Sequence, residues 1–248
     1  MPHTKSKANL RWLAQRSITT KPMMHRWIIA LCGIALPLIG FSQWGIYGHY
    51  LNTTLPEWQQ LSQEAHGNSF AVQASGPAIG VNYWFRLKTR RIEFWPGLQI
   101  SLQQLRLSPN ATVTLVIHQL SAEWPIAIYP FDLGSDCHCP TFSKQGPALA
   151  KGFFVALIPT LSWLHYLPTD SSLLPPDSQW ITQLGLRIGL DIGLSRRWTF
   201  TPYVGHQWAQ SWQYASIGPL LDLPATNVPP SRAYSWQAGL QLRWRWQQ

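Results

Sequence analysis

The chain has 248 residues, of which 12% are charged and 13% aromatic, and it contains 15 tryptophans. An average soluble domain is about 25% charged, so the composition argues against an ordinary water-facing surface. The formal net charge is +9, but residues 1–42 hold six of the 19 basic residues and none of the ten acidic ones. Because most of the excess charge lies in this leader, the charge balance disfavours a nucleic acid partner.

The leader, residues 1–42, has the parts of a secretory signal peptide. A basic segment precedes an apolar run at 27–39, and small residues follow at Gly40 and Ser42. The run is too short for a comfortable transmembrane helix. We therefore predict cleavage after Ser42, with an uncleaved N-terminal anchor as the alternative.

Residues 182–195 alternate strictly between aliphatic and polar or glycine positions, which predicts a β-strand. The strand is about twice as long as a usual strand of five or six residues. A tilted strand of about ten residues can cross a bilayer with apolar side chains facing lipid and polar ones facing a lumen. A long strand of a soluble barrel, with the leucines in the core, is the alternative. The apolar face holds Leu184, Leu186, Ile188, Leu190, Ile192 and Leu194, and the other face holds Gln183, Gly185, Arg187, Gly189, Asp191, Gly193 and Ser195.

Six further segments also indicate strands, and short polar turns at 88–90 and 195–197 join two pairs of them as antiparallel hairpins. Bacterial outer-membrane barrels have an even number of strands, and eight is the smallest. An eighth strand must therefore lie in 43–69, or within 70–87 or 111–131. The clearer segments are 79–87, 92–102, 198–212 and 234–246, and the less clear ones are 111–131 and 152–166.

The sequence thus predicts an all-β chain that forms a closed, antiparallel, up-and-down transmembrane β-barrel, with eight strands. We divide the chain into a leader (1–42), a periplasmic lead-in or first strand (43–69) and the outer-membrane barrel (70–248). Closure would leave no unpaired strand edge in lipid, where each unpaired backbone group costs several kcal/mol.

Two stretches carry a resemblance to a known family. The hairpin 83–97 (YWFRLKTRRIEFWPG) and the run 129–154, with CHCPTFSK at 137–144, resemble uncharacterised outer-membrane β-barrel proteins of Bacteroidota, small barrels of the OmpA/OmpX type. The resemblance covers about residues 70–248. It implies an outer-membrane location with lipid and lipopolysaccharide as neighbours, and it implies neither a reaction nor a cofactor.

The last strand resembles the C-terminal signal that the barrel assembly machinery recognises. Its elements are Gln237, Gly239, Leu242 and Trp244, although the chain ends in Gln247-Gln248 rather than on an aromatic residue. A periplasmic C-terminus would place the turns 88–90 and 195–197 in the periplasm. The loops 107–112, 167–178 and 216–232 would then face outward, and the Cys137–Cys139 loop would be periplasmic.

Cys137 and Cys139 flank His138, and thiolates and imidazole suit zinc. Only three ligands lie close together once Asp136 is included, so the metal signal is weak. In an oxidising compartment a disulfide is the commoner fate of two cysteines, although a ring this small is strained. We predict a disulfide, with free thiols or a metal as alternatives.

The lumen-facing charges have two interpretations, a salt-bridged plug or a narrow, anion-leaning pore. An eight-stranded barrel is only wide enough for its own side chains, which favours the plug. The charges are Arg86, Arg91, Glu93, Arg187, Asp191, Arg243 and Arg245.

Catalytic motifs are absent from the sequence, so we expect a structural or surface-interaction protein rather than an enzyme. A small channel is the alternative, and an enzyme that acts on lipid A or peptides ranks third. Candidates for such an enzyme would be His118, His165 and His206 with Ser162, Asp191 or Glu93, but two of these histidines stand beside tryptophans and fit interfacial positions better.

Overall fold

The computed structural model describes residues 43–66, 71–87, 92–106, 115–131, 152–169, 176–195, 197–214 and 229–245. The chain divides into the units Met1–Gly40 and Phe41–Gln248, and all described residues belong to the second. The predicted leader, Arg91 and the Cys137–Cys139 motif lie outside the described residues. Within the described ranges, no helix has both the length and the apolar character that a bilayer crossing requires.

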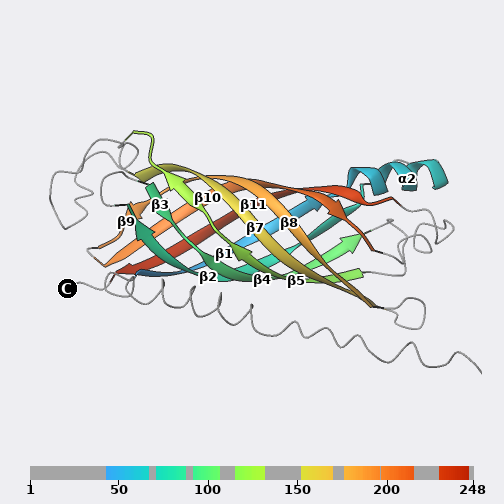
Figure 1. Cartoon of the computed structure of the whole chain (residues 1–248), viewed down its shortest axis with the longest axis horizontal. Helices are drawn as coiled ribbons and strands as arrows, with labels where there is room; N and C mark the ends of the chain where they lie inside the picture. Colours follow the sequence, from blue (N-terminus) through green and yellow to red (C-terminus); the bar gives the residue numbers. More distant parts are fainter. Residues whose placement is uncertain are drawn as a thin grey trace, which may run out of the picture. The chain divides into compact units, whose positions relative to one another are not determined.

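The strands form a closed antiparallel ring of eight, as predicted from the sequence. Three members of the ring are interrupted, because β3 continues into β4, β5 into β6 and β8 into β9 (Figure 1). The ring runs β1, β11, β10, β8, β7, β5, β4 and β2, and β2 pairs with β1 to close it. The strands are β1 (Gln43–Thr54), β2 (Gln73–Arg86), β3 (Ile92–Phe94), β4 (Gly97–Arg106), β5 (Leu115–Glu123), β6 (Ile126–Ile128), β7 (Phe153–Pro168), β8 (Asp177–Leu190), β9 (Ile192–Gly193), β10 (Trp198–Trp212) and β11 (Ser231–Arg245).

The eighth strand is β1, which pairs along its whole length with β2 on one side and β11 on the other. Within the predicted segment 43–69, Gln43–Thr54 is therefore the first wall strand. It continues into α2 (Pro56–His66), which begins at a proline, a residue favoured at the first helical position because its missing N–H needs no partner there. The helix is 11 residues long.

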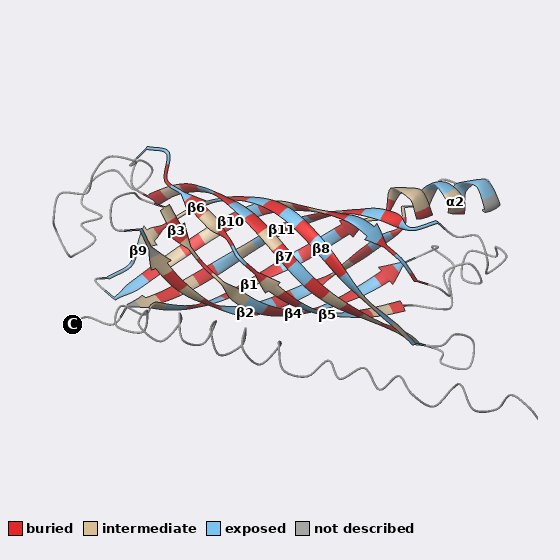
Figure 2. Cartoon of the chain, viewed as in Figure 1, coloured by how far each residue is buried: buried red, intermediate tan, exposed pale blue. Residues whose placement is uncertain are grey.

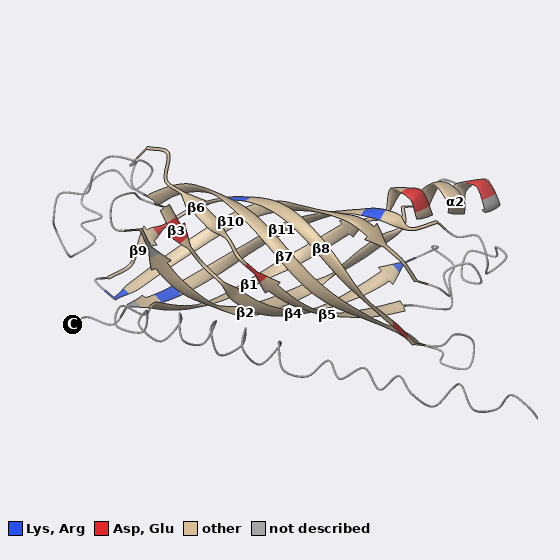
Figure 3. Ribbon diagram, viewed as in Figure 1, with Lys and Arg blue, Asp and Glu red and all other residues tan. Residues whose placement is uncertain are grey.

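Buried and exposed residues alternate along every long strand (Figure 2). On β8, Leu184, Leu186 and Ile188 are 44–46% exposed, whereas Arg187 is 1% exposed. The aliphatic face therefore lies on the outside of the barrel, and the alternative of a soluble barrel with a leucine core is wrong. Charged residues are sparse on the wall, as Figure 3 shows.

Prolines interrupt the hydrogen-bond ladder of adjacent strands near one end of the barrel. A proline has no N–H to donate, but its carbonyl still accepts. Each carbonyl takes the N–H of a residue on a neighbouring strand, so the wall stays connected where β3 gives way to β4 and β5 to β6. The bonds are Tyr83 N to Pro96 O (2.9 Å), Trp95 N to Pro125 O (2.9 Å) and Trp124 N to Pro159 O (3.0 Å).

The two ends of the barrel differ. At the turn end, β2 meets β3, β9 meets β10, and Gln43 pairs with Arg245. At the loop end lie α2 and the strand termini Thr54, Trp212 and Ser231. β6 ends and β7 begins at the turn end as well.

Candidate functional site

Two levels of outward-facing aromatic residues flank the aliphatic band. On β11, Trp236 and Trp244 mark the two levels. Eight residues at ~3.3 Å each, at a usual tilt of ~40°, put ~20 Å between them along the barrel axis. The turn-end level contains Trp44, Tyr83, Phe85, Phe94, Trp124, Phe131, Phe153, Trp198, Phe200 and Trp244, and the loop-end level contains Tyr50, Trp163, Trp180, Trp208, Tyr234 and Trp236.

These aromatic residues pack against one another across neighbouring strands. The ring centroids of Trp44 and Tyr83 are 5.5 Å apart, and those of Phe85 and Phe94 are 5.2 Å apart. Tryptophan and tyrosine favour the boundary between an apolar and a wet environment. An aliphatic band between two aromatic levels is the exterior of a transmembrane barrel.

Inside, Arg243 is the centre of the layer nearest the turn end. Its guanidinium group pairs with Asp191 and, at 3.4 Å, with Glu93. The rings of Trp84 and Trp95 flank it, with centroids 5.8 and 4.5 Å from the guanidinium carbon. The same carboxylates accept further hydrogen bonds, so the buried charges are compensated from several strands. The additional donors are Trp84 Nε1 and Trp95 Nε1 to Glu93, Thr201 Oγ1 to Asp191, and Tyr129 Oη, whose single proton lies within reach of both carboxylates.

Arg187 is the centre of a second layer, deeper in the barrel. Its Nη2 lies 3.4 Å from Glu123 Oε2 and 3.3 Å from Gln237 Oε1. The Tyr203 ring centroid is 4.4 Å from the guanidinium carbon, which adds a cation–π contact. The second oxygen of Glu123 accepts from Gln207 Nε2 at 3.4 Å. The ion pair is therefore enclosed by hydrogen-bonding and aromatic groups.

Between Arg187 and the loop end, uncharged polar side chains fill the lumen. Gln119 Nε2 donates to Ser121 (2.9 Å) and Ser162 (3.0 Å), and its Oε1 accepts from Gln103 (2.9 Å). Thr53 extends this belt to Gln103 at 3.2 Å. Each of these residues is at most 5% exposed. The side-chain hydrogen bonds of this belt connect β1, β4, β5 and β7 within the lumen.

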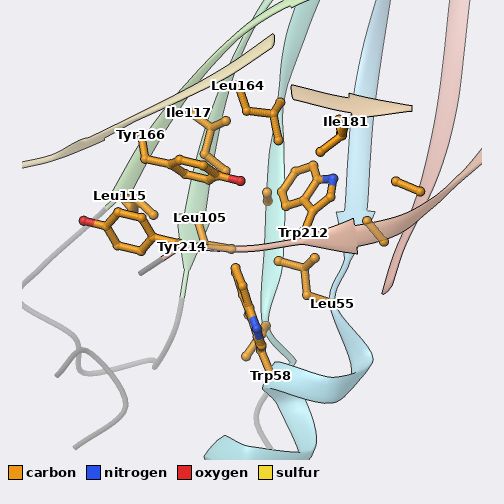
Figure 4. Packing of buried hydrophobic residues seen from close by; sticks show 14 residues of the cluster. Leu55, Trp58, Leu105, Leu115, Ile117, Leu164, Tyr166, Ile181, Trp212 and Tyr214 are labelled. Atoms are coloured by element: carbon orange, nitrogen blue, oxygen red, sulfur yellow. The ribbon is translucent and has the colours of Figure 1, made fainter. Parts of the chain in front are cut away.

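Apolar clusters close both ends of the lumen. At the turn end, the cluster surrounds the Arg243 layer, and at the loop end it includes Leu55, just before α2, and Trp58 of α2 (Figure 4). The turn-end cluster is Trp84, Trp95, Ala127, Tyr129, Phe154, Ala156 and Tyr203. The loop-end cluster is Leu55, Trp58, Val72, Ala74, Leu105, Leu115, Ile117, Leu164, Tyr166, Ile181, Ala209, Trp212, Tyr214 and Ala233, with Leu61 packed against it.

The exposure of the two arginines indicates that the lumen is filled. A water-filled pore would leave lumen-facing guanidinium groups accessible, but Arg187 is 1% and Arg243 3% exposed. Lumen-facing glycines provide room for the large side chains: a Cβ at Gly189 would lie 2.6 Å from Cζ of Phe154. The geometry therefore supports the salt-bridged plug over the pore.

Of the seven predicted lumen charges, the structure places Glu93, Arg187, Asp191 and Arg243 inside the barrel. Arg86 and Arg245 are in β2 and β11, but their side chains are outside what the structure describes, as is the whole of Arg91. The sequence interpretation missed Glu123. The alternation that turns Trp124 outward also turns Glu123 inward, so the signal was present. Tyr129 was missed because Pro125 interrupts the strand before it.

The four residues of the predicted assembly signal lie on both faces of β11. Gln237 is buried and accepts from Arg187, and Gly239 lies against β1, where a Cβ would lie 2.9 Å from Cα of His49. Leu242 and Trp244 face outward. Recognition by the assembly machinery stays a prediction.

The wall separates the three candidate histidines from the candidate serine and carboxylates. His118, His165 and His206 lie on the outer face, where His165 stacks on Trp163 (5.4 Å). Ser162, Asp191 and Glu93 face the lumen, on the other side of the wall. Among the described residues, no group of three His, Cys, Asp or Glu side chains could hold a metal ion.

At the loop end, Glu57 fastens α2 to the start of β11. Its carboxylate accepts from Ser231 Oγ (2.9 Å), Arg232 N (2.9 Å) and Arg232 Nε (2.5 Å). Partial burial acts to raise the pKa of Glu57, but the hydrogen bonds from Arg232 and Ser231 lower it below its ordinary value of 4.5. Trp58 Nε1 donates to Pro229 O at 3.1 Å. We call these contacts the α2 latch.

The fold and exterior define the class of this protein, a small transmembrane β-barrel. No protein-family model matches the sequence, and no curated protein matches it. Among solved structures, Neisserial surface protein A is 9% identical, with a TM-score of 0.38 and coverage of 84% of this chain and 97% of that chain.

Two further structures are similar at the same level. Ail of Yersinia pestis, solved with the heparin analogue sucrose octasulfate, is 10% identical with a TM-score of 0.38, covering 82% of this chain and 99% of that chain. The outer membrane protein OprG from Pseudomonas aeruginosa is 12% identical with a TM-score of 0.36, covering 82% and 96%. Because these identities and TM-scores are low, the evidence for the fold is the closed strand order of the chain itself.

Proposed function

We propose that this chain is an integral outer-membrane β-barrel with a structural or surface-interaction role. The observation that carries the proposal is the combination of an aliphatic, aromatic-bounded exterior with a filled lumen. The exterior fits a bilayer, because in a bilayer its apolar side chains are removed from water and its backbone groups are paired within the closed barrel. The lumen supports no path for solutes, because Arg187 and Arg243 are covered on all sides. The surfaces available for interaction are then the two ends and the lipid-facing wall.

A bacterial outer membrane is the location that this architecture fits, because short-turned antiparallel barrels of eight strands occur there. The leader, with cleavage after Ser42, would direct the chain to the periplasm, and the last strand would engage the barrel assembly machinery. Lipid and lipopolysaccharide would be the neighbours of the wall. An origin in Bacteroidota stays a prediction from the resemblance of 83–97 and 129–154.

A non-enzymatic role is supported by the separation of His118, His165 and His206 from the lumen residues Ser162 and Asp191. Nucleophilic catalysis needs the nucleophile and base within hydrogen-bond reach, and the wall lies between these groups.

The test is fractionation followed by gel migration. The expressed chain should co-fractionate with the outer membrane, and unheated samples should migrate differently from boiled ones. Absence from that fraction would contradict the proposal. In planar bilayers, the refolded protein should give little conductance, and R187A/R243A should lose heat resistance without gaining a defined conductance. Ion-selective conductance that changes in R187A/R243A would favour the channel instead.

A further inference from the structure

Two histidines lie directly opposite each other on the outer surface of the wall. His118 on β5 and His165 on β7 are register partners in the antiparallel pairing of these strands. Both side chains point outward, because His118 is exposed and His165 half-buried, whereas their neighbours along the chain are buried. Directly opposed residues of an antiparallel pair have Cβ atoms about 4.5–5.5 Å apart. The wall therefore holds two imidazoles side by side on its exterior.

The histidine pair lies at the loop-end aromatic level, at the edge of the aliphatic band. The next outward row towards the middle of the barrel contains Trp163, which pairs with Trp180 on β8. His165 stacks on Trp163, with ring centroids 5.4 Å apart and planes inclined by 8°. On β8, the register partner of His165 is the exposed Ser178. The pair is therefore within reach of water and of the ions dissolved in it.

The two imidazoles have no polar partner among the described residues. Neither His118 nor His165 forms a hydrogen bond or an ion pair there, and Nδ1 of His165 is a covered atom without a partner. Neutral imidazole is a preferred ligand of zinc, nickel and copper ions. A metal ion that would bind both side chains therefore has no hydrogen bond of the protein to displace.

The spacing of the pair suits one metal ion. Metal–nitrogen bonds of about 2.0–2.1 Å at a tetrahedral angle hold two imidazole nitrogens about 3.3 Å apart. Two histidines whose Cβ atoms are about 5 Å apart can reach this separation by rotamer changes, which are fast for exposed side chains. The strand pairing thus brings the two ligands together before the metal arrives.

Two protein ligands leave the other coordination positions open. Among the described residues, no third His, Cys, Asp or Glu completes a metal-binding group. An ion bound here keeps water in its remaining positions, as in open metal sites. It joins β5 and β7 across the outer face of the wall, and Gln119 and Ser162 join the same two strands by a hydrogen bond of 3.0 Å on the inner face.

We propose that His118 and His165 form a binding site for a divalent transition-metal ion of the kind that imidazole prefers, namely Zn²⁺, Ni²⁺ or Cu²⁺. The ion takes one nitrogen from each strand and connects β5 to β7 at the loop end. The site goes beyond the proposed function. It rests on the strand register alone, so it depends neither on the membrane location nor on the filled lumen.

His206 on β10 provides a matched control. It also points outward at the loop-end level, and its ring centroid lies 4.5 Å from that of Trp236 and 5.3 Å from that of Trp208. Its register partners are Leu186 and Trp236, so no second imidazole stands opposite it in the described strands. H206Q therefore removes an exterior histidine without removing a pair.

The test is calorimetric titration of Ni²⁺ into the untagged, full-length barrel in detergent micelles, with the same micelles as the blank. We expect H206Q to bind like the wild type. H118Q and H165Q should each bind about tenfold more weakly, because the second imidazole of a pair acts at high effective concentration. Heat-modifiable migration checks that each variant is folded, and either variant carries the test if the other fails to fold. Equal affinities for the wild type and these two variants would overturn the proposal.

The Cys137–Cys139 motif, which lies outside the described residues, is another source of metal ligands in the chain. C137S/H138Q/C139S should bind Ni²⁺ like the wild type. Electron paramagnetic resonance of its Cu²⁺ complex should show two coordinated imidazole nitrogens, and addition of H165Q should remove one of them. Loss of binding in C137S/H138Q/C139S would assign the ion to the motif and overturn the site at His118 and His165.

Discussion

Arg187 on β8 and Glu123 on β5 form a buried ion pair, with Nη2 3.4 Å from Oε2, although β7 lies between their strands. The same guanidinium group reaches Gln237 on β11, two strands away in the other direction. One side chain therefore links β5, β8 and β11, which span five neighbouring strands of the ring. We expect it to contribute more to the stability of the barrel than any exposed charge.

A double-mutant cycle tests this pair. R187M should destabilise the barrel by about 3–5 kcal/mol, because Glu123 is left buried without its partner. R187M/E123L should recover most of that loss, since a buried ion pair can often be replaced by apolar residues of similar volume. Urea unfolding in micelles, followed by tryptophan fluorescence, measures both. A double variant as unstable as R187M would contradict the assignment of the loss to an uncompensated charge.

Gly189 should tolerate no side chain. In G189A the new Cβ would lie 2.6 Å from Cζ of Phe154 and 2.8 Å from the Pro202 carbonyl oxygen. Forcing extra volume into a packed interior costs about 1–3 kcal/mol. Urea unfolding should show a loss of this size. G48A is the control, because the nearest atom to a Cβ there is at an ordinary 3.6 Å, and it should unfold like the wild type.

The α2 latch should weaken in acid. Hydrogen bonds from Arg232 and Ser231 outweigh the effect of burial and hold the pKa of Glu57 below its ordinary value of 4.5. A carboxyl group with a lowered pKa in the folded state stabilises the fold above its unfolded-state pKa. This contribution falls as the pH drops below about 4.5 and is lost once the pH passes the folded-state value.

Near-ultraviolet circular dichroism between pH 7 and pH 3 follows the packing of Trp58 and its neighbours. The wild type should show a transition on the acid side that E57Q lacks. The same transition in E57Q would assign it to another group.

Secretion should remove the leader directly before the barrel. Cleavage after Ser42 leaves Gln43, which is the first residue of β1, at the new N-terminus. The mass of the protein from the outer-membrane fraction should match residues 43–248. A mass that includes the apolar run at 27–39 would support the uncleaved anchor instead.

The sequence predicts the wall well because most outward-facing positions are apolar. The two faces of β8 separate cleanly, and so do those of β10 and β11. β1 was less visible because its inward residues include Tyr47 and Leu51. Near the ends of the barrel the inward face is also apolar, so the period of two disappears there.

The pairing inside the lumen could not be predicted from the sequence. The alternation puts Arg187, Asp191 and Glu93 inside, but the partner of each depends on the stagger of strands that are not neighbours. Asp191 pairs with Arg243, which lies 52 positions away in the chain, and Arg187 pairs with Glu123, 64 positions away. The sequence also contains no signal that α2 covers the loop end of the lumen, because Trp58 supplies most of the apolar surface of this helix.

The pairing of β1 with β11 also constrains how the chain reaches its folded state. Thr53 bonds Ser235, which lies 182 positions further along the chain, and all of β1 pairs with β11. Contacts between such distant parts of a chain form slowly, because the loop-closure entropy is lost before they contribute. The pairing of β1 with β11 is therefore a folding step that must wait until β11 has been synthesised. A nascent barrel without its final strand would expose two unpaired edges, a form that chaperones would have to hold until β1 and β11 pair.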